Sequence, residues 1–370
     1  MNENFCPAPW TSLYFDPTGE VDNCCISKNL LGNYNLGSIQ TIIFSEKNKQ
    51  IKQDMLDNKY IPGCKSCSNK SQSLQKSMVK LLYKDGNPLY DNTDNFNLEY
   101  LDARWSNTCN LACVYCCPEF SSVWAQELQQ EIKLNKSSKD KLLNYVLANI
   151  KTIKNIYMAG GEPLLMKENE LVIAALKEHN PKCQVLVNTN LTQVKSSKIF
   201  TDLLELRNVK WLISVESMHD QFEYIRYPAK WDDFAGNLAH LRARTAIDAI
   251  SFHMVLTALN GLEFWNTADW LITQGFDLQK MTVTLYNNGA YPGPLDVRNL
   301  PVEHQQQILA RMCSNPAYKK IAGWQNVYDY LSANQTMDTE LWWYLEGLDK
   351  RRNLNSQTVF PEIYKYKDTQ

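Results

Sequence analysis

Three cysteines, Cys109, Cys113 and Cys116, have the residue type and the spacing to hold a metal centre. The pattern Cys-x3-Cys-x2-Cys lets one compact loop bring the three thiolates around a single site. Thiolates are soft ligands that select iron-sulfur clusters or zinc, and a cubic cluster of four irons bound by only three thiolates keeps one iron open for chemistry. A closed zinc site would need a fourth ligand, for which the adjacent Cys117 is the candidate.

A glycine-rich segment, Met-Ala-Gly-Gly-Glu-Pro at residues 158–163, follows the cysteine loop. Gly160 and Gly161 come directly after a predicted strand, where the missing side chains let backbone groups approach a ligand. Glu162 can accept charge-assisted hydrogen bonds from an ammonium group. The spacing of the three cysteines, the aromatic Tyr115 just before Cys116 and this glycine-rich segment together resemble the radical S-adenosylmethionine (SAM) superfamily.

The resemblance implies a mechanism and a set of site residues. In the family, the open iron of a [4Fe-4S] cluster chelates the amino and carboxylate groups of SAM, and an electron from the cluster cleaves the sulfonium to a 5'-deoxyadenosyl radical. Cys109, Cys113 and Cys116 would be the cluster ligands and thus the catalytic residues. The implied cofactor-binding residues are Tyr115, Gly160, Gly161, Glu162, Asn190, Ser214, Glu216 and Arg226.

Individual roles follow from the same resemblance. Arg226 would face the SAM carboxylate, since a guanidinium suits forked recognition, and Tyr115 would pack on the adenine. Asn190, Ser214 and Glu216 stand at the tips of predicted strands, where they would bind the ribose and carboxylate of SAM. Each polar residue has a plainer alternative as a cap or loop group, and Tyr115 has one as a core residue.

Four more thiolate positions lie near the amino terminus: Cys6, one of Cys24 or Cys25, Cys64 and Cys67. Residues 12–15 and 20–22 predict a hairpin that ends on Cys24 and Cys25. The arrangement resembles the auxiliary-cluster module called SPASM or, in its one-cluster form, twitch, here placed ahead of the radical domain. The spacing from Gly19 favours Cys24 over Cys25 as the ligand, and a small zinc ribbon is the alternative to an iron-sulfur cluster.

Composition narrows the function classes. The 370 residues carry a net charge of -2 without a block of Lys or Arg, so charge disfavours nucleic acid and anionic membranes as partners. The amino terminus lacks an export signal, and no stretch approaches the ~20 apolar residues of a spanning helix. We therefore expect a cytoplasmic protein, in which the eleven cysteines favour metal ligation over disulfides.

Six segments of strand character alternate with mostly helical patterns beyond residue 97. They are 98–103, 153–158, 184–188, 209–215, 250–256 and 280–285. This alternation predicts a parallel sheet with right-handed crossovers. Six units are fewer than a full barrel, and the resemblance implies the family's partial (β/α)6 TIM-like barrel, an α/β fold. Further helices are expected at 41–56 and 120–134.

We expect three regions in the chain. Residues 1–95 would form a small α+β auxiliary-cluster domain and linker, 96–300 the radical SAM partial barrel, and 301–370 a helical extension. The extension carries a dense aromatic set, Trp324, Tyr328, Tyr330, Trp342, Trp343 and Tyr344. These side chains would pack as core on the open side of the barrel or, alternatively, cover the substrate as a lid.

The sequence thus predicts a radical SAM oxidoreductase with two [4Fe-4S] clusters, one binding SAM and one auxiliary. The expected reaction is hydrogen abstraction from a substrate carbon in peptide or natural-product modification, by oxidation, crosslinking or epimerisation. A small-molecule dehydrogenase and a non-catalytic metal-binding scaffold are the alternatives, and an RNA substrate is disfavoured by charge. The expected partners are a peptide or small-molecule substrate and an electron donor such as flavodoxin or ferredoxin.

Overall fold

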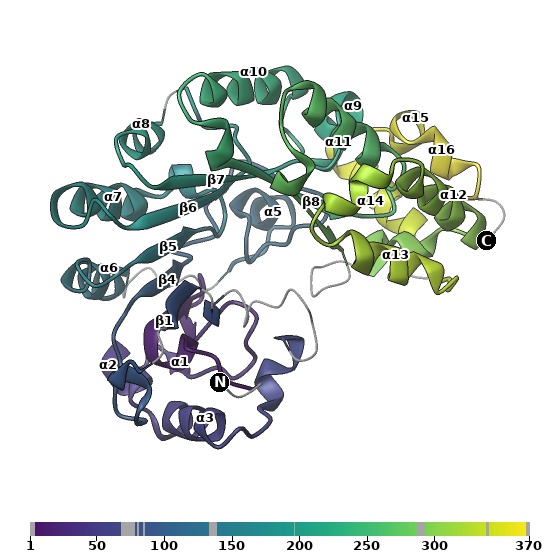
Figure 1. Ribbon diagram of the computed structural model, residues 1–370. Coiled ribbons are helices and arrows are strands. Elements are labelled where there is room, and N and C mark those ends of the chain that lie inside the picture. Colours follow the sequence, from purple (N-terminus) through teal and green to yellow (C-terminus); the bar gives the residue numbers. More distant parts are fainter. Residues whose placement is uncertain are drawn as a thin grey trace. The chain divides into compact units, whose positions relative to one another are not determined.

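The computed structural model describes residues 4–67, 78–79, 81–83, 86–132, 139–195, 197–286, 293–337 and 340–367 (Figure 1). The chain forms two compact units. Unit 1 comprises residues 1–108, 132–188 and 197–209, and unit 2 comprises residues 109–131, 189–196 and 210–370.

Unit 1 begins with the predicted hairpin. After helix α1 (Ala8–Thr11), strands β1 (Ser12–Phe15) and β2 (Glu20–Asp22) pair antiparallel, and β3 (Gly32–Asn33) pairs with β2. Gly19 takes a φ of +94°, which closes the turn at little conformational cost, and Thr18 N donates to Asp16 Oδ1 over 2.9 Å. The hairpin prediction is confirmed.

A parallel sheet continues directly from the hairpin in unit 1. Strand β1 pairs parallel with β4 (Tyr100–Ala103), and β5 (Asn155–Met158) and β6 (Gln184–Thr189) follow in order. Helices α6 (Lys139–Ala148), α7 (Lys167–His179) and α8 (Lys198–Leu204) lie next to β5 and β6 (Figure 1). Ile156 and Met158 of β5 are buried while Tyr157 is only half-buried, so the two faces of the sheet differ in polarity.

The helix expected at 41–56 was predicted wrongly as one element. It is two helices, α2 (Ile39–Ile43) and α3 (Glu46–Leu56). The Ser45 side chain accepts a hydrogen bond from Asn48 N and so caps a new helix, which interrupts the first one. Beyond α3, the 3-10 helix η1 (Pro62–Cys67) carries two of the predicted thiolates.

Unit 2 supplies the remaining parallel strands. Strand β8 (Ile250–Leu256) pairs with β7 (Val209–Ser214) on one side and β9 (Met281–Leu285) on the other. The intervening helices are α9 (His219–Ile225), α10 (Trp231–Arg242) and α11 (Glu263–Thr273). All six predicted strands are therefore present, and the mixed α/β class with parallel strands is confirmed.

Helix α5 (Ser122–Glu127) is much shorter than the helix predicted at 120–134. Gln129 takes a φ of +52°, a left-handed conformation that ends the helix, and residues 133 and 134 lie outside the described residues.

The carboxyl-terminal region is helical, as predicted. It contains α12 (Val302–Cys313), α13 (Trp324–Ser332), α14 (Leu341–Arg352), α15 (Ser356–Val359) and α16 (Pro361–Tyr364). Leu341, Leu345 and Phe360 share a core cluster with Val114. Trp342 and Tyr344 pack against this cluster, which supports their prediction as core, whereas Trp343 is exposed.

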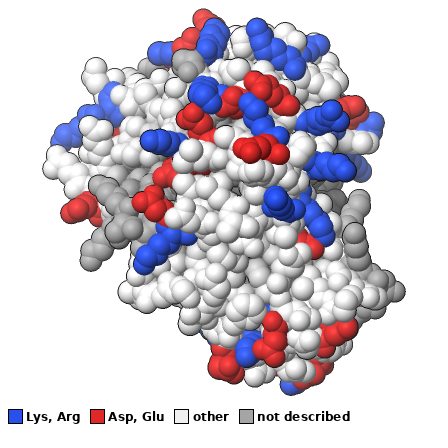
Figure 2. All heavy atoms as spheres, turned by 90° about the vertical axis from the view of Figure 1, so that its left-hand side faces the viewer, with Lys and Arg blue, Asp and Glu red and all other residues white. Residues whose placement is uncertain are grey.

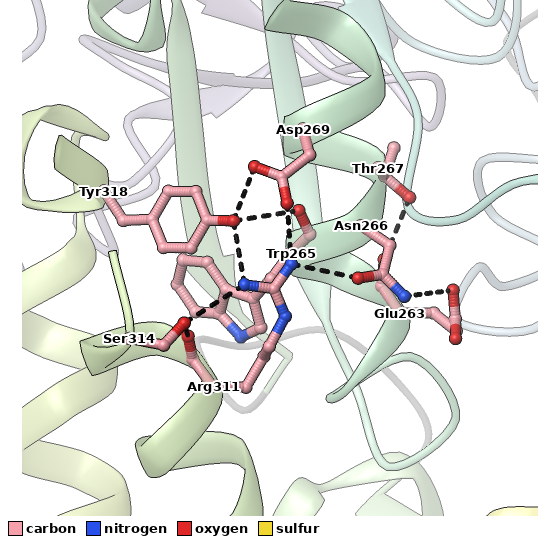
Figure 3. A network of polar contacts seen from close by, with 8 residues as sticks. All are labelled: Glu263, Trp265, Asn266, Thr267, Asp269, Arg311, Ser314 and Tyr318. Atoms are coloured by element: carbon pink, nitrogen blue, oxygen red, sulfur yellow. Dashed lines mark hydrogen bonds and ion pairs between the residues drawn. The ribbon is translucent and has the colours of Figure 1, made fainter. Parts of the chain in front are cut away.

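A polar network fastens α12 to α11 (Figure 3). Arg311 donates from Nη2 to Asp269 Oδ2 over 2.7 Å and from Nη1 to Tyr318 Oη over 3.0 Å. Tyr318 in turn donates to Asp269 Oδ1 over 2.6 Å. Each polar group in this triangle has a partner, so the network joins the extension to the rest of unit 2.

Candidate functional site

The three cysteines of the predicted cluster loop lie together in unit 2. Cys113 is buried, and Cys109 and Cys116 are half-buried. Cys116 N donates to Cys113 O over 2.9 Å, which closes a turn between these two residues. Ser122 Oγ donates to Cys109 O over 2.9 Å, and Trp124 Nε1 donates to Cys113 O over 2.7 Å, so α5 fixes the loop at two points.

Segments of unit 2 other than α5 also form hydrogen bonds with the cysteine loop. Ala112 N donates to Tyr227 O over 2.7 Å, and Val114 N donates to Ile225 O over 2.8 Å. Tyr344 of α14 donates its hydroxyl to Val114 O over 2.6 Å. The loop is thus held by side chains and backbone of the chain, and its three-thiol donor set fits a cluster that leaves one iron open.

Three of the predicted residues form a buried network beside the loop. Glu216 and Arg226 are 1% and 3% exposed, and the Arg226 guanidinium donates to both carboxylate oxygens of Glu216 over 2.5 and 2.7 Å. Tyr115 Oη donates to Glu216 Oε1 over 2.8 Å. Burial raises the pKa of Tyr115 well above its usual value, Arg226 opposes the rise and Glu216 adds to it.

The same guanidinium reaches the cysteine loop. Arg226 Nη1 lies 3.9 Å from Cys113 Sγ, and Nη2 lies 2.5 Å from Tyr115 Oη. The structure therefore brings together four predicted residues, Cys113, Tyr115, Glu216 and Arg226. The guanidinium of Arg226, however, binds the carboxylate of Glu216 in the same chain. Its predicted role toward the SAM carboxylate, and that of Tyr115 toward the adenine, stay predictions.

Asn190 lies at the opposite end of the loop. Its Nδ2 donates to Asn110 Oδ1 over 3.1 Å and points at Cys109 Sγ, 4.0 Å away. Its Oδ1 accepts hydrogen bonds from Thr192 N and Oγ1, which orient the amide. Ser214 is half-buried at the end of β7, and its role stays a prediction.

The glycine-rich segment belongs to unit 1 and follows β5 directly. Gly160 takes a φ of +118°, and a Cβ on Gly161 would stand 2.1 Å from Thr108 O. Neither position accommodates a side chain. Glu162 is 0% exposed, its N donates to Thr108 O over 2.8 Å, and its Oε1 accepts from Leu164 N over 3.1 Å to cap a 3-10 turn.

The four predicted auxiliary thiolates also lie in unit 1. The pKa of Cys6 is raised to about 12, chiefly by burial and in part by the charges of Cys64 and Cys67, while a backbone hydrogen bond from Ala8 opposes the rise. Burial and then the Cys6 charge raise the pKa of Cys24. The thiols are therefore near enough to act on one another, although no group of three or more ligating side chains that could hold one metal ion was found among the described residues.

Cys25 has different neighbours from Cys24. Burial and then the charge of Asp102 raise the pKa of its thiol, to about 11, and the charge of Arg104 opposes the rise. Its thiol also hydrogen-bonds the Asp102 carboxylate. The choice of Cys24 rather than Cys25 as the fourth auxiliary ligand stays a prediction.

The Asp102 cluster is a feature of unit 1 that the sequence analysis missed. Asp102 is buried on β4, and Arg104 donates to both of its oxygens over 3.2 and 3.3 Å. The Tyr14 ring lies 5.0 Å from the Arg104 guanidinium. Two charged residues of opposite sign, two positions apart at the end of a strand, were the available signal, because such residues share one face.

Comparison with known families agrees with this geometry. Residues 104–271 match the family model of the radical SAM superfamily, and residues 6–68 match the model of the SPASM iron-sulfur cluster-binding domain. The chain contains a radical SAM domain and a SPASM domain. Radical SAM domains hold a [4Fe-4S] cluster and SAM, and SPASM domains hold auxiliary iron-sulfur clusters.

Curated relatives are similar to part of the chain. A GTP 3',8-cyclase of Mycolicibacterium smegmatis is 28% identical over 174 residues, which cover 46% of each chain. A GTP 3',8-cyclase of Corynebacterium glutamicum is 29% identical over 204 residues, covering 53% of this chain and 52% of that protein. The chain spans about half the length of these relatives.

Solved structures are similar at low identity. The enzyme anSMEcpe with bound AdoMet is 15% identical, with a TM-score of 0.42 and coverage of 64% of this chain and 63% of that one. Streptococcus suis SuiB bound to its precursor peptide SuiA is 16% identical, with a TM-score of 0.40 and coverage of 86% and 68%.

Proposed function

We propose that this chain is a radical SAM enzyme that cleaves SAM reductively and abstracts a hydrogen atom from a carbon of a peptide or natural product. The observation that carries the proposal is the rigidly held loop with Cys109, Cys113 and Cys116, inside the matched radical SAM domain. When bound, the cluster and SAM supply a 5'-deoxyadenosyl radical, which is strong enough to attack unactivated carbon.

The residues of the chain have separate tasks in this proposal. Cys109, Cys113 and Cys116 bind three irons, while Asn190 orients the thiolate of Cys109. Gly160 and Gly161 let backbone groups approach the methionine part of SAM, and Glu162 accepts hydrogen bonds from its ammonium. The roles of Ser214, Glu216, Arg226 and Tyr115 in SAM binding belong to the same proposal.

The SPASM domain has a second, distinct task. Cys6, Cys24, Cys64 and Cys67 would fill all four thiolate positions of an auxiliary cluster, which leaves no site for substrate on its irons. We therefore assign it electron transfer or structural support. A flavodoxin or ferredoxin would deliver the electron for SAM cleavage.

The peptide or natural-product substrate in this proposal rests on the resemblance to the radical SAM superfamily. Charge gives no support to nucleic acid: basic and acidic side chains are interspersed on the face seen in Figure 2. No helix in the described part of the chain has the length and apolarity of a membrane span.

Anaerobic reconstitution with iron and sulfide tests the proposal. We expect iron at the cysteine loop and, with dithionite, release of 5'-deoxyadenosine from SAM. Cys113→Ala should reduce this release to background, while Cys313→Ala, which removes an exposed thiol at the end of α12, should retain it.

Two outcomes would contradict this assignment. Protein that binds iron but never cleaves SAM would be a scaffold, and unchanged cleavage in Cys113→Ala would remove the loop from the mechanism. GTP is included as a candidate substrate because the curated relatives act on it by name, and GTP-stimulated 5'-deoxyadenosine formation would replace the peptide assignment.

A further inference from the structure

Arg352, the last residue of α14, is a buried cation with unused hydrogen-bond donors. Its side chain is 1% exposed, and only Nε has a partner, Glu127 Oε2 at 2.9 Å. Nη1 and Nη2 are buried without a hydrogen-bond partner within the described residues. Such donors are rare in native proteins and usually indicate that a polar or charged group is missing from their surroundings.

The position of this guanidinium relates it to the cysteine loop. It stacks on the Trp124 ring, 4.6 Å from the centroid, and lies 4.9 Å from the Tyr227 ring. Trp124 Nε1 donates to Cys113 O, and Tyr227 O accepts from Ala112 N. Both residues that hold the guanidinium are thus bonded to the backbone of the loop.

The local charges leave an excess of positive charge. Arg351 Nε also binds Glu127, at Oε1 over 2.8 Å, so two guanidinium groups share one carboxylate. Arg226 is already neutralised by Glu216, whereas Arg352 has no carboxylate of its own.

We propose that Arg352 is a positioning residue of the radical SAM site, whose charge and unpaired donors stabilise the negative charge of the cluster bound by Cys113 and so raise its reduction potential. This inference rests on the proposed function. One electron from a low-potential donor, dithionite in the test, adds one negative charge at this cluster, and no bond or proton changes. A buried cation packed on the residues that hold the cysteine loop would favour the reduced state of a cluster bound there. The helical extension would thereby contribute directly to the redox chemistry.

The reduction potential of iron-loaded protein tests this inference. The potential is measured by redox titration monitored by EPR. The signal that changes when SAM is added belongs to the cluster at the cysteine loop, and this change distinguishes it from the signal of the auxiliary cluster. Arg352→Met keeps an unbranched apolar side chain but removes the guanidinium and its charge. We expect the equilibrium constant for reduction to fall at least tenfold, a shift of about 59 mV for one electron.

Arg351→Met is the matched control. It removes the same charge and the same Glu127 partner, but from a side chain that is 35% exposed, so we expect less than a twofold change. If the equilibrium constant for reduction of fully iron-loaded Arg352→Met lies within twofold of the wild-type constant, the inference is overturned. If Arg352→Met does not yield iron-loaded protein, Arg352→Lys is measured in its place. Retention of the wild-type reduction potential in Arg352→Lys supports a role for the charge. A tenfold fall in the equilibrium constant for reduction overturns the inference.

The two proposals fail in different ways. Wild-type protein that binds no cluster at the cysteine loop would refute the proposed function. Wild-type protein that binds the cluster and cleaves SAM, with a potential insensitive to Arg352, would refute this inference alone.

Discussion

Arg226 and Glu216 form a buried ion pair next to the cysteine loop. Removing one partner of such a pair costs about 3–5 kcal/mol, because the other charge stays buried and uncompensated. The pair is therefore part of the fold as well as of the proposed site. Residue types and strand positions were enough to predict both side chains, but not their mutual contact, since that depends on where α9 ends relative to β7.

His304 gives a prediction at the same scale. It lies on α12, is 1% exposed, and packs edge-on against Tyr366. Burial, assisted by the positive charge of Lys365, lowers its pKa from 6.5 to about 4. The unfolded chain therefore takes up a proton at higher pH than the folded chain does. The contribution of the neutral His304 side chain to the free energy of unfolding is fully present above pH 6.5 and is lost as the pH falls toward 4.

We expect this loss to amount to about 3 kcal/mol between pH 7 and pH 4. Urea unfolding of wild type and of His304→Phe at several pH values measures it, since the variant lacks the titrating group. His179→Gln, at an exposed histidine, is the control and should keep the wild-type pH dependence. Equal pH dependence in wild type and His304→Phe would contradict the prediction.

At the scale of elements, the hydrophobic periodicity and the amino-acid composition were sufficient to predict where the strands lie. The predicted segments 209–215 and 250–256 differ by at most one residue from β7 and β8, because β-branched and apolar runs end at polar tips. Helix ends were less predictable. Ser45 and Gln129 set them through a side-chain cap and a left-handed backbone, neither of which changes the hydrophobic pattern.

Contacts between distant segments could not be read from the sequence. Tyr344 appeared only as one of the aromatic residues of the predicted extension, and Arg352 was not singled out, yet Tyr344 donates to the backbone of the cysteine loop, 230 residues earlier. The parallel pairing of β1 with β4 was missed for the same reason. Sequence motifs located the thiolates and the glycines, and tertiary packing added the residues that hold them.

Gly161 provides the prediction for an element, the turn after β5. An added Cβ would stand 2.1 Å from Thr108 O, which already accepts a hydrogen bond from Glu162 N. Because the backbone would have to move, we expect Gly161→Ala to destabilise the protein by about 1–3 kcal/mol. Urea unfolding measures the change.

Gly236→Ala is the matched control in α10. There the nearest atom to an added Cβ is Lys195 Nζ at 4.0 Å, so the variant should be neutral or stabilised by up to about 1 kcal/mol. Equal destabilisation in both variants would show that the close approach to Thr108 is unimportant.

At the scale of the whole molecule, the two units carry different chemical groups. Unit 1 contains the auxiliary thiolates, the glycine-rich turn and the Asp102 cluster, while unit 2 contains the cysteine loop and both arginines near Cys113. The predicted boundaries at residues 95 and 300 stay a prediction, and each of the two units is assembled from several segments of the chain.

Iron content tests the presence of two centres. Reconstituted wild type should bind about eight irons, four in each cluster. Cys24→Ala should lose about half of this iron, because its thiol lies by Cys6, whereas Cys25→Ala should keep all of it, because that thiol lies by Asp102. Colorimetric iron analysis distinguishes the two variants, and the reverse pattern would assign the ligand to Cys25.

The parallel pairing of β1 with β4 limits how the protein can be shortened. A product that starts near residue 96 would present the backbone amides and carbonyls of β4 as an open edge, ready to recruit the same strand from another molecule. Such a truncated protein should precipitate or associate with itself even if its own cluster assembles. We therefore expect the amino-terminal hairpin to protect the solubility of the radical SAM domain.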